Sequence, residues 1–298
     1  MKNIRIIQGL MRSLSLSDEE LYDLINYDLE NGINVFDLAD IYGNGQVEEK
    51  LGRILKEHKE LREKMYIQTK CSIVKCDDTY YDLSYEHIIE SVNKSLERLN
   101  IDCIDSLLLH RPDILMDSKE IKKAFVELKE KGLVHHFGVS NFSKEAIEYL
   151  KCELGDLIEV NQIQLGLGHM KLIEEELNFN MDNEEGVSHT SSTFFYLKRN
   201  NIQIQAWSPF LVGFFDGSIF DSNRFPNINN KLEELALKYN CAKATIATNF
   251  LLMLDSNLMV VTGSMNKSHI NDSIKACEFK LDKKDWYSLY KAQGKMLP

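Results

Sequence analysis

Eight short apolar segments recur along the chain, and a longer segment with helical periodicity follows most of them. The short segments span four to six residues and are rich in β-branched or aromatic side chains, which is typical of buried strands. They are residues 5–8, 34–37, 65–69, 105–109, 136–139, 158–163, 202–207 and 258–261.

The intervening segments carry helix signals. Ser17-Asp-Glu-Glu20 is a capping box and predicts a helix that begins there and ends near Asn31-Gly32. A second helix is predicted after a cap at Ser84, because apolar residues recur there at helical spacing: Ile88, Val92, Leu96 and Leu99. Further helices are predicted over 119–131, 143–150, 190–200, 231–239 and 244–254.

Eight strands that alternate with helices predict an α/β fold with a parallel sheet, closed as a (β/α)8 or TIM barrel. An open doubly wound sheet is the alternative, and it is disfavoured because no Gly-x-Gly-x-x-Gly follows the first strand. No linker or low-complexity tract divides the chain, so residues 1–298 are expected to form a single domain. Two connections, 71–83 and 165–189, exceed or reach the ~12–15 residues above which loops usually cover a site or are disordered.

Composition narrows the class of partner. The chain has 298 residues with 46 acidic and 35 basic side chains, and 46 − 35 gives a net charge of −11, which argues against a nucleic-acid partner.

The apolar runs are too short to span a membrane, and Met1–Arg5 shows no export signal. Six dispersed cysteines without a Cys-x-x-Cys pair suit a reducing cytoplasm and make a metal site improbable. We expect a cytoplasmic protein, and the absence of heptads makes a monomer the default.

Polar residues that could take part in catalysis follow the predicted strands, at the end of the barrel where active sites lie. Asp37 ends the second strand and Tyr42 follows it, while Lys70 and His110 end the third and fourth. Any one of them could serve packing or reach solvent. Four on three adjacent strand ends are hard to explain as packing, because that layer of a barrel is usually filled by Val, Ile and Leu.

These four residues fit one chemical scheme. A free tyrosine has a pKa of about 10, and a neighbouring ammonium such as Lys70 lowers it towards the range useful for general acid catalysis. Asp37 would hold Lys70, and His110 could donate a hydrogen bond to a substrate oxygen. The set protonates a carbonyl oxygen but has no reductant, so it implies a cofactor that carries hydride.

Longer motifs carry a family resemblance. Asn34-Val-Phe-Asp-Leu-Ala-Asp-Ile-Tyr-Gly43, followed by Glu48-Glu-Lys-Leu-Gly52, resembles the first signature of the aldo-keto reductase superfamily. Matching later motifs occur in the same order at residues 68–71, 107–113, 138–142, 161–162 and 206–209. Residues 110–117 are similar to a bacterial subfamily described only as oxidoreductases.

The resemblance implies an NAD(P)H-dependent reductase that turns an aldehyde or ketone, a small-molecule substrate, into an alcohol. Tyr42 would be the general acid, Lys70 and Asp37 would lower its pKa, and His110 would orient the carbonyl. Further positions would bind the cofactor: Ser140, Asn141 and Gln162 at the nicotinamide carboxamide, Trp207 stacked on the ring, and Ser208 and Leu211 along the pyrophosphate.

The segment after the last strand resembles the family's site for the adenosine 2′-phosphate, with Gly263, Ser264 and Asn266 in place. His269 stands where the family usually has arginine, and a histidine is mostly neutral at pH 7. Lys267 could supply the missing charge. The resemblance therefore implies NADP(H), with NAD(H) not excluded.

Two other functions remain open at this point. A nucleotide-binding regulatory subunit with little or no turnover could keep the same four residues. A metal-dependent barrel hydrolase using Asp37, Asp40 and His110 ranks last, because Lys70 would repel a divalent ion. The family resemblance says least about which substrate is used, since Gln164–His169 departs from the family pattern.

Overall fold

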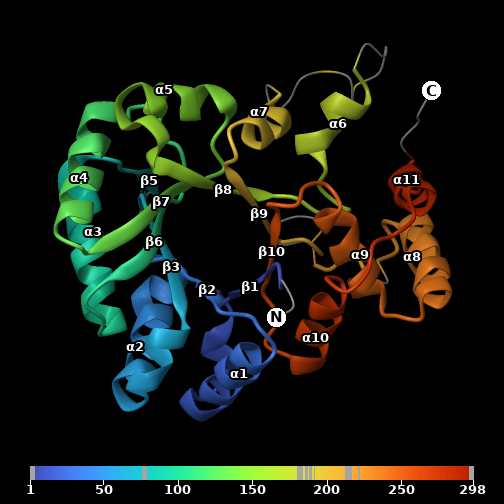
Figure 1. The fold of residues 1–298 in the computed structure, drawn as a ribbon, viewed down its shortest axis with the longest axis horizontal. Helices are drawn as coiled ribbons and strands as arrows, with labels where there is room; N and C mark the ends of the chain where they lie inside the picture. The colour runs from blue at the N-terminus through green and yellow to red at the C-terminus, as the bar shows by residue number, and fades with distance from the viewer. Residues whose placement is uncertain are drawn as a thin grey trace. The chain divides into compact units, whose positions relative to one another are not determined.

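Eight parallel strands form a closed barrel in the order β1-β10-β9-β8-β7-β6-β3-β2 (Figure 1). The structure, a computed structural model, describes residues 4–75, 79–179, 184, 187, 190, 192–211, 217–220 and 222–294. The barrel strands are β1 (Ile6–Gly9), β2 (Val35–Asp37), β3 (Tyr66–Cys71), β6 (Ile104–Leu109), β7 (Val134–Ser140), β8 (Ile158–Gln164), β9 (Gln203–Trp207) and β10 (Met259–Thr262). All eight predicted strands are confirmed, with ends displaced by at most two residues.

The chain divides into two compact units. The first unit comprises residues 7–162 and 263–265, and the second comprises the described residues among 4–6, 163–262 and 266–294. The helices of the first unit are α1 (Asp18–Glu30), α2 (Gln46–Glu57), α3 (Tyr85–Leu99), α4 (Ser118–Glu130) and α5 (Lys144–Leu154). Those of the second unit are α6 (Lys171–Leu177), α7 (Thr193–Arg199), α8 (Pro226–Tyr239), α9 (Lys243–Leu252), α10 (Lys267–Lys275) and α11 (Lys283–Lys291).

The capping predictions in the first unit are confirmed. The Glu20 backbone N–H donates to Ser17 Oγ at 3.1 Å, and the Ser17 N–H donates to the Glu20 carboxylate at 2.7 Å. Ser84 caps α3 through one such bond, in which its Oγ accepts from the His87 N–H at 3.3 Å. These bonds satisfy donors that the first turn of a helix leaves unpaired, and they explain where α1 and α3 begin.

Several elements were not predicted. Helices α2, α6, α10 and α11 were absent from the predicted set, and the connection 71–83 contains an antiparallel hairpin of β4 (Ile73–Val74) and β5 (Tyr80–Tyr81). Helix α8 begins at Pro226 rather than Lys231, because a proline at the first helical position leaves no N–H unpaired.

Helix α2 is held tightly against α3. Gly52 lies where a Cβ would come within 2.0 Å of the Arg98 carbonyl oxygen, so only glycine permits this approach of the two backbones.

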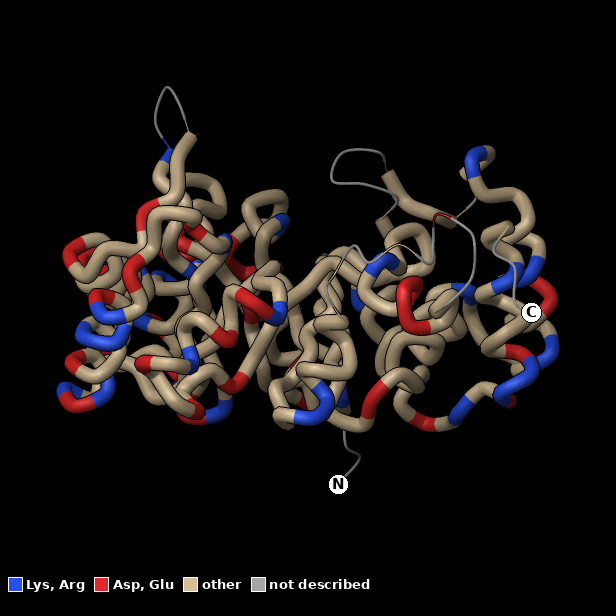
Figure 2. Tube along the Cα trace, turned by 90° about the horizontal axis from the view of Figure 1, so that it is seen from above, with Lys and Arg blue, Asp and Glu red and all other residues tan. Residues whose placement is uncertain are grey.

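In Figure 2 acidic and basic residues are intermixed along the chain. Throughout the described ranges, every helix is too short or too polar to cross a bilayer.

Candidate active site

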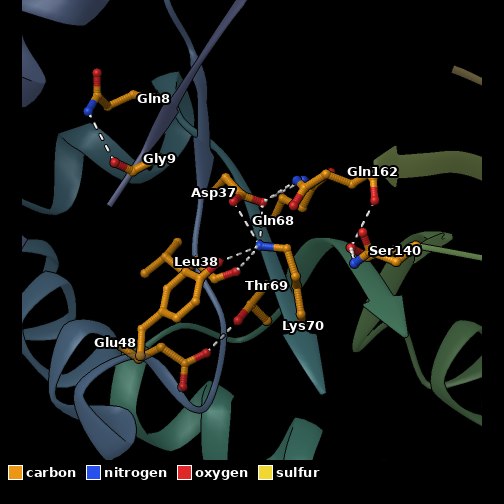
Figure 3. A network of polar contacts seen from close by, with 12 residues as sticks. Gln8, Gly9, Asp37, Leu38, Glu48, Gln68, Thr69, Lys70, Ser140 and Gln162 are labelled. Carbon is orange, nitrogen blue, oxygen red and sulfur yellow. Dashed lines mark hydrogen bonds and ion pairs between the residues drawn. The ribbon is translucent and has the colours of Figure 1, made fainter. Parts of the chain in front are cut away.

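An ion pair between Asp37 and Lys70 lies at the centre of the first unit's polar network (Figure 3). β2 and β3 are neighbours, and Lys70 Nζ donates to the two Asp37 carboxylate oxygens at 2.8 and 2.7 Å. A third bond runs from Nζ to the Leu38 carbonyl oxygen at 2.6 Å. Both side chains are buried. Burial alone would lower the pKa of Lys70, but Asp37 and Tyr42 outweigh it and raise the pKa, so the ammonium stays charged.

Two glutamine amides complete the surroundings of Asp37. Gln68 Nε2 donates to Asp37 Oδ1 at 2.7 Å, and Gln162 Nε2 donates to the same oxygen at 2.9 Å. The carboxylate therefore accepts four hydrogen bonds, two from the Lys70 ammonium and one from each glutamine amide. A buried carboxylate that is paired and hydrogen-bonded in this way holds its partner ammonium in one position.

Tyr42 and His110 lie next to this ion pair. The Tyr42 hydroxyl is 3.5 Å from Lys70 Nζ, and Nζ is 5.2 Å from the centroid of the phenol ring. The Tyr42 and His110 rings meet edge to face, with centroids 6.0 Å apart and an interplanar angle of 82°. The structure thus brings together the four residues that the sequence placed on three neighbouring strand ends.

The pKa of Tyr42 agrees with the expectation in the effect of Lys70, but it differs from the expectation in the effect of Asp37 and in the net direction. Burial of the phenol raises the pKa above 10.0; Lys70 opposes this rise and Asp37 adds to it. The reason is that the low-dielectric surroundings disfavour the phenolate, and that the Asp37 carboxylate offsets part of the field of Lys70. Tyr42 is therefore protonated at neutral pH, as a proton donor must be.

His110 is uncharged in this setting. Its backbone N–H donates to the Cys71 carbonyl oxygen at 2.8 Å, which fixes the residue at the end of β6. Burial, followed by the charges of Lys70 and Arg111, lowers the pKa of the imidazole well below 6.5. Its Nδ1 is buried and has no partner among the described residues. A neutral imidazole keeps one N–H donor for a ligand oxygen.

Ser140, Asn141 and Gln162 form one connected set near the ends of β7 and β8, and Figure 3 shows Ser140 beside Gln162. Ser140 Oγ donates to the Gln162 carbonyl oxygen at 2.9 Å, and Asn141 Nδ2 donates to Ser140 Oγ at 2.9 Å. Asn141 has a φ of 61°, the left-handed conformation that asparagine tolerates. Because Gln162 also binds Asp37, this set is tied to the ion pair, a link that the sequence did not reveal.

Arg12 is a candidate that the sequence analysis missed. A Cβ placed on Gly263 would lie 2.9 Å from Arg12 Nη1, so the guanidinium group covers the glycine backbone after β10. Gln8 Nε2 donates to the Ser264 carbonyl oxygen at 3.0 Å and fixes the same segment. Arg12 follows the first strand closely, and applying the strand-end rule to that strand would have found it.

The remaining predicted cofactor residues belong to the second unit. Trp207 ends β9, Ser208 has a φ of 50°, and the Leu211 N–H donates to the Ser208 carbonyl oxygen at 3.2 Å, so the three form a tight turn. Asn266 caps α10 through its Oδ1 and the Ser268 N–H at 2.8 Å. Lys267 and His269 lie exposed in the first turn of that helix.

Three further residues of the predicted long connections have ordinary roles or lie outside the described residues. Burial raises the pKa of the Cys71 thiol well above 9.0, so Cys71 is a packed, unreactive side chain. His169 forms a small antiparallel bridge with Gly166. His189 lies outside the described residues.

Three comparisons relate this chain to known proteins. The model of the aldo/keto reductase family matches residues 5–293. The chain is 32% identical to the "Uncharacterized oxidoreductase YcsN" of Bacillus subtilis, over 99% of this chain and 96% of the relative. It is 30% identical to "Oxidoreductase YdhF" of Escherichia coli, over 97% and 93% of the two chains. The solved aldo-keto reductase of Klebsiella pneumoniae, in complex with NADPH, has a TM-score of 0.77 at 17% identity and covers 97% of this chain and 90% of that one.

Proposed function

Because the chain belongs to the aldo/keto reductase family of NAD(P)H-dependent oxidoreductases, we propose that it reduces an aldehyde or ketone to an alcohol with Tyr42 as the proton donor. The observation that carries this proposal is the Lys70 ammonium, held by Asp37 at 2.7 Å and lying 3.5 Å from the Tyr42 hydroxyl. A protonated phenol beside a fixed cation and a neutral imidazole is suited to placing a proton on a carbonyl oxygen.

The proton transfer follows from the charges of this site. As a carbonyl oxygen gains negative charge, the Tyr42 hydroxyl gives it a proton, and the Lys70 ammonium stabilises the phenolate that remains. The high pKa of Tyr42 keeps the proton in place until that charge develops. His110 donates its remaining N–H to the same oxygen and so orients the carbonyl for the transfer.

NADP(H) is the cofactor that the family uses, and when bound it supplies the hydride. The nicotinamide carboxamide needs donors and acceptors together, and the connected set of Ser140, Asn141 and Gln162 offers both. We assign these three residues to the carboxamide and Trp207 to the ring face. Ser208 and Leu211 are assigned to the pyrophosphate.

The phosphate groups need positive charge and close approach to backbone. Gly263 leaves the space that a Cβ would fill, and the Arg12 guanidinium group lies over that space. We therefore add Arg12 to Gly263 and Ser264 as residues that hold a cofactor phosphate. Asn266, Lys267 and His269 at the start of α10 are assigned to the adenosine 2′-phosphate. Arginine presents a planar fork of donors that matches phosphate oxygens.

Cofactor titration followed by turnover tests this function. The chain has two tryptophans, so we expect NADPH to quench the fluorescence of Trp207, and Trp207→Phe to abolish most of that quenching. Wild-type protein should then oxidise bound NADPH when aldehydes and diketones are added. Quenching without turnover on any carbonyl would instead indicate a regulatory nucleotide-binding subunit, and the absence of binding would refute the cofactor assignment.

A further inference from the structure

The arginines of the first unit fall into two groups. Three form ion pairs: Arg53 with Asp18, Arg62 with Asp105, and Arg98 with Glu48. In the part of the chain that the structure describes, Arg12 and Arg111 form no ion pair with an acidic side chain. Arg12 lies over Gly263 and is accounted for by the cofactor. Arg111 is a half-buried cation without a carboxylate partner among the described residues, so its charge is available to an anionic ligand.

The backbone of Arg111 is fixed beside the reacting groups. It directly follows His110, and its N–H donates to Ser72 Oγ at 3.0 Å. The Ser72 hydroxyl in turn donates to the Arg111 carbonyl oxygen at 3.4 Å, and the Ser72 carbonyl oxygen accepts from the Asp82 N–H at 2.8 Å. These bonds attach Arg111 to the segment that carries the β4–β5 hairpin.

Ser72 makes these bonds in a conformation that side-chain-bearing residues rarely adopt. Its φ is 126°, a region in which a residue other than glycine is strained. The surrounding structure must over-determine this strain, and strained residues cluster where a ligand has to be held. Here the strained residue fixes Arg111 immediately after the histidine that faces Tyr42.

The net charge at the reacting groups is positive. Lys70 and Asp37 cancel, because one positive and one negative charge form the ion pair, and His110 is neutral. Arg111 adds one uncompensated positive charge, and its field helps to lower the pKa of both Tyr42 and His110. A chain with a net charge of −11 thus carries a cation directly after His110, one of the residues proposed to bind the substrate carbonyl.

We propose that Arg111 binds a carboxylate on the substrate, so that the preferred substrates are aldehydes or ketones that carry a carboxylate near the carbonyl. This inference rests on the proposed function, because Tyr42 and His110 define where the carbonyl lies. A carboxylate matches the guanidinium fork with two parallel hydrogen bonds. The remote charge would anchor the substrate while His110 and Tyr42 act on the carbonyl oxygen.

A matched substrate pair tests the inference. Carboxybenzaldehyde and its methyl ester carry the same aldehyde and differ in charge, and both are assayed with NADPH. We expect wild-type protein to favour the acid, and Arg111→Met to lower kcat/KM for the acid about 10- to 100-fold, mainly through KM, as a charge-assisted hydrogen bond implies. The kcat/KM for the ester should change less than about twofold in this variant. Arg111→Lys should retain part of the preference.

The control is Arg53→Met, which removes the same charge from a surface pair with Asp18 and should leave both substrates unaffected. Benzoate binding to the NADPH complex gives a readout independent of turnover, and calorimetry should show it weakened by Arg111→Met only. Far-UV circular dichroism and thermal unfolding establish that each variant is folded.

The outcomes separate the two proposals. Equal use of acid and ester by wild-type protein, or an equal loss for both in Arg111→Met, overturns the carboxylate inference and leaves the reductase intact. If wild-type protein binds NADPH but turns over neither aldehyde, the reductase proposal fails. In that case benzoate binding still tests the role of Arg111, and an unchanged benzoate affinity in Arg111→Met overturns the inference.

Discussion

The candidate residues of the two units differ in how the chain holds them. In the first unit Asp37 and Lys70 are buried, and each is hydrogen-bonded to several partners. In the second unit Lys267 and His269 are exposed side chains in the first turn of α10. The groups assigned to proton transfer are therefore preorganised by buried contacts, whereas those assigned to the 2′-phosphate are in contact with solvent that binding must displace.

Loss of the buried cation should have the largest effect. Lys70→Met leaves Asp37 as a buried carboxylate without its charged partner, which costs about 3–5 kcal/mol of the free energy of unfolding. We expect urea unfolding to show this loss and turnover to fall below detection. Lys129→Met, an exposed helical lysine, should change neither. The double variant with Asp37→Asn should be more stable than Lys70→Met alone, and an equal or lower stability would contradict a buried ion pair.

Asp40 gives a second way to probe the buried network of the first unit. Burial and the nearby Glu48 carboxylate raise the pKa of Asp40 to about 7, and its Oδ1 has no hydrogen-bond partner among the described residues. A carboxyl whose pKa is higher in the folded than in the unfolded protein adds to the free energy of unfolding at pH values below its unfolded pKa of 3.8. That contribution is lost as the pH rises to about 7, the pKa in the folded protein.

We therefore expect Asp40→Asn to raise the free energy of unfolding at pH 8 by about 2–4 kcal/mol and to change it little at pH 4. Denaturant melts of both proteins across this pH range measure the effect. The same gain at both pH values would show that Asp40 does not titrate as its surroundings imply.

Arg12 should matter for cofactor affinity more than for stability, since its guanidinium group is exposed. Arg12→Met should weaken NADPH binding about tenfold, the scale of one charge-assisted contact. Fluorescence titration with NADPH and NADH locates the phosphate: an equal loss for both cofactors indicates the pyrophosphate, and a loss for NADPH alone indicates the 2′-phosphate. Unchanged affinity for both would remove Arg12 from the cofactor site.

The smallest effect is expected at the exposed start of α10. His269→Arg supplies a permanent charge and should raise the preference for NADPH over NADH about threefold, as exposed charge pairs are worth only about 0.2–1 kcal/mol. The ratio of the two dissociation constants measures it. An unchanged ratio would mean that the 2′-phosphate is bound by other residues.

The sequence predicted the barrel well because its strands are short apolar segments between helices. It missed α2 because Glu48 and Lys50 are buried on the inner side of that helix and interrupt its apolar pattern. Glu48 accepts a hydrogen bond from Thr69 Oγ1 at 2.6 Å and pairs with Arg98, so its burial is compensated by partners that sequence spacing does not show.

Part of the site could be predicted from the pattern of strands alone. Strand ends place Asp37, Lys70 and His110 at one rim, and that needs only the strand order. The hydrogen bond from Gln162 to Asp37 joins residues 125 positions apart on β8 and β2, which are not neighbours in the barrel, so it depends on closure of the barrel. The direction of the Tyr42 pKa depends on burial, which no spacing of charged residues reveals.

The role of Tyr42 is tested most directly by single-turnover oxidation of bound NADPH by an aldehyde, in wild-type protein and in Tyr42→Phe. Phenylalanine keeps the ring and removes only the hydroxyl that lies 3.5 Å from Lys70 Nζ. The account predicts a rate at least about 10²-fold lower, the usual contribution of general acid catalysis, with an unchanged dissociation constant for NADPH. A Tyr42→Phe rate within twofold of wild type would contradict Tyr42 as the proton donor.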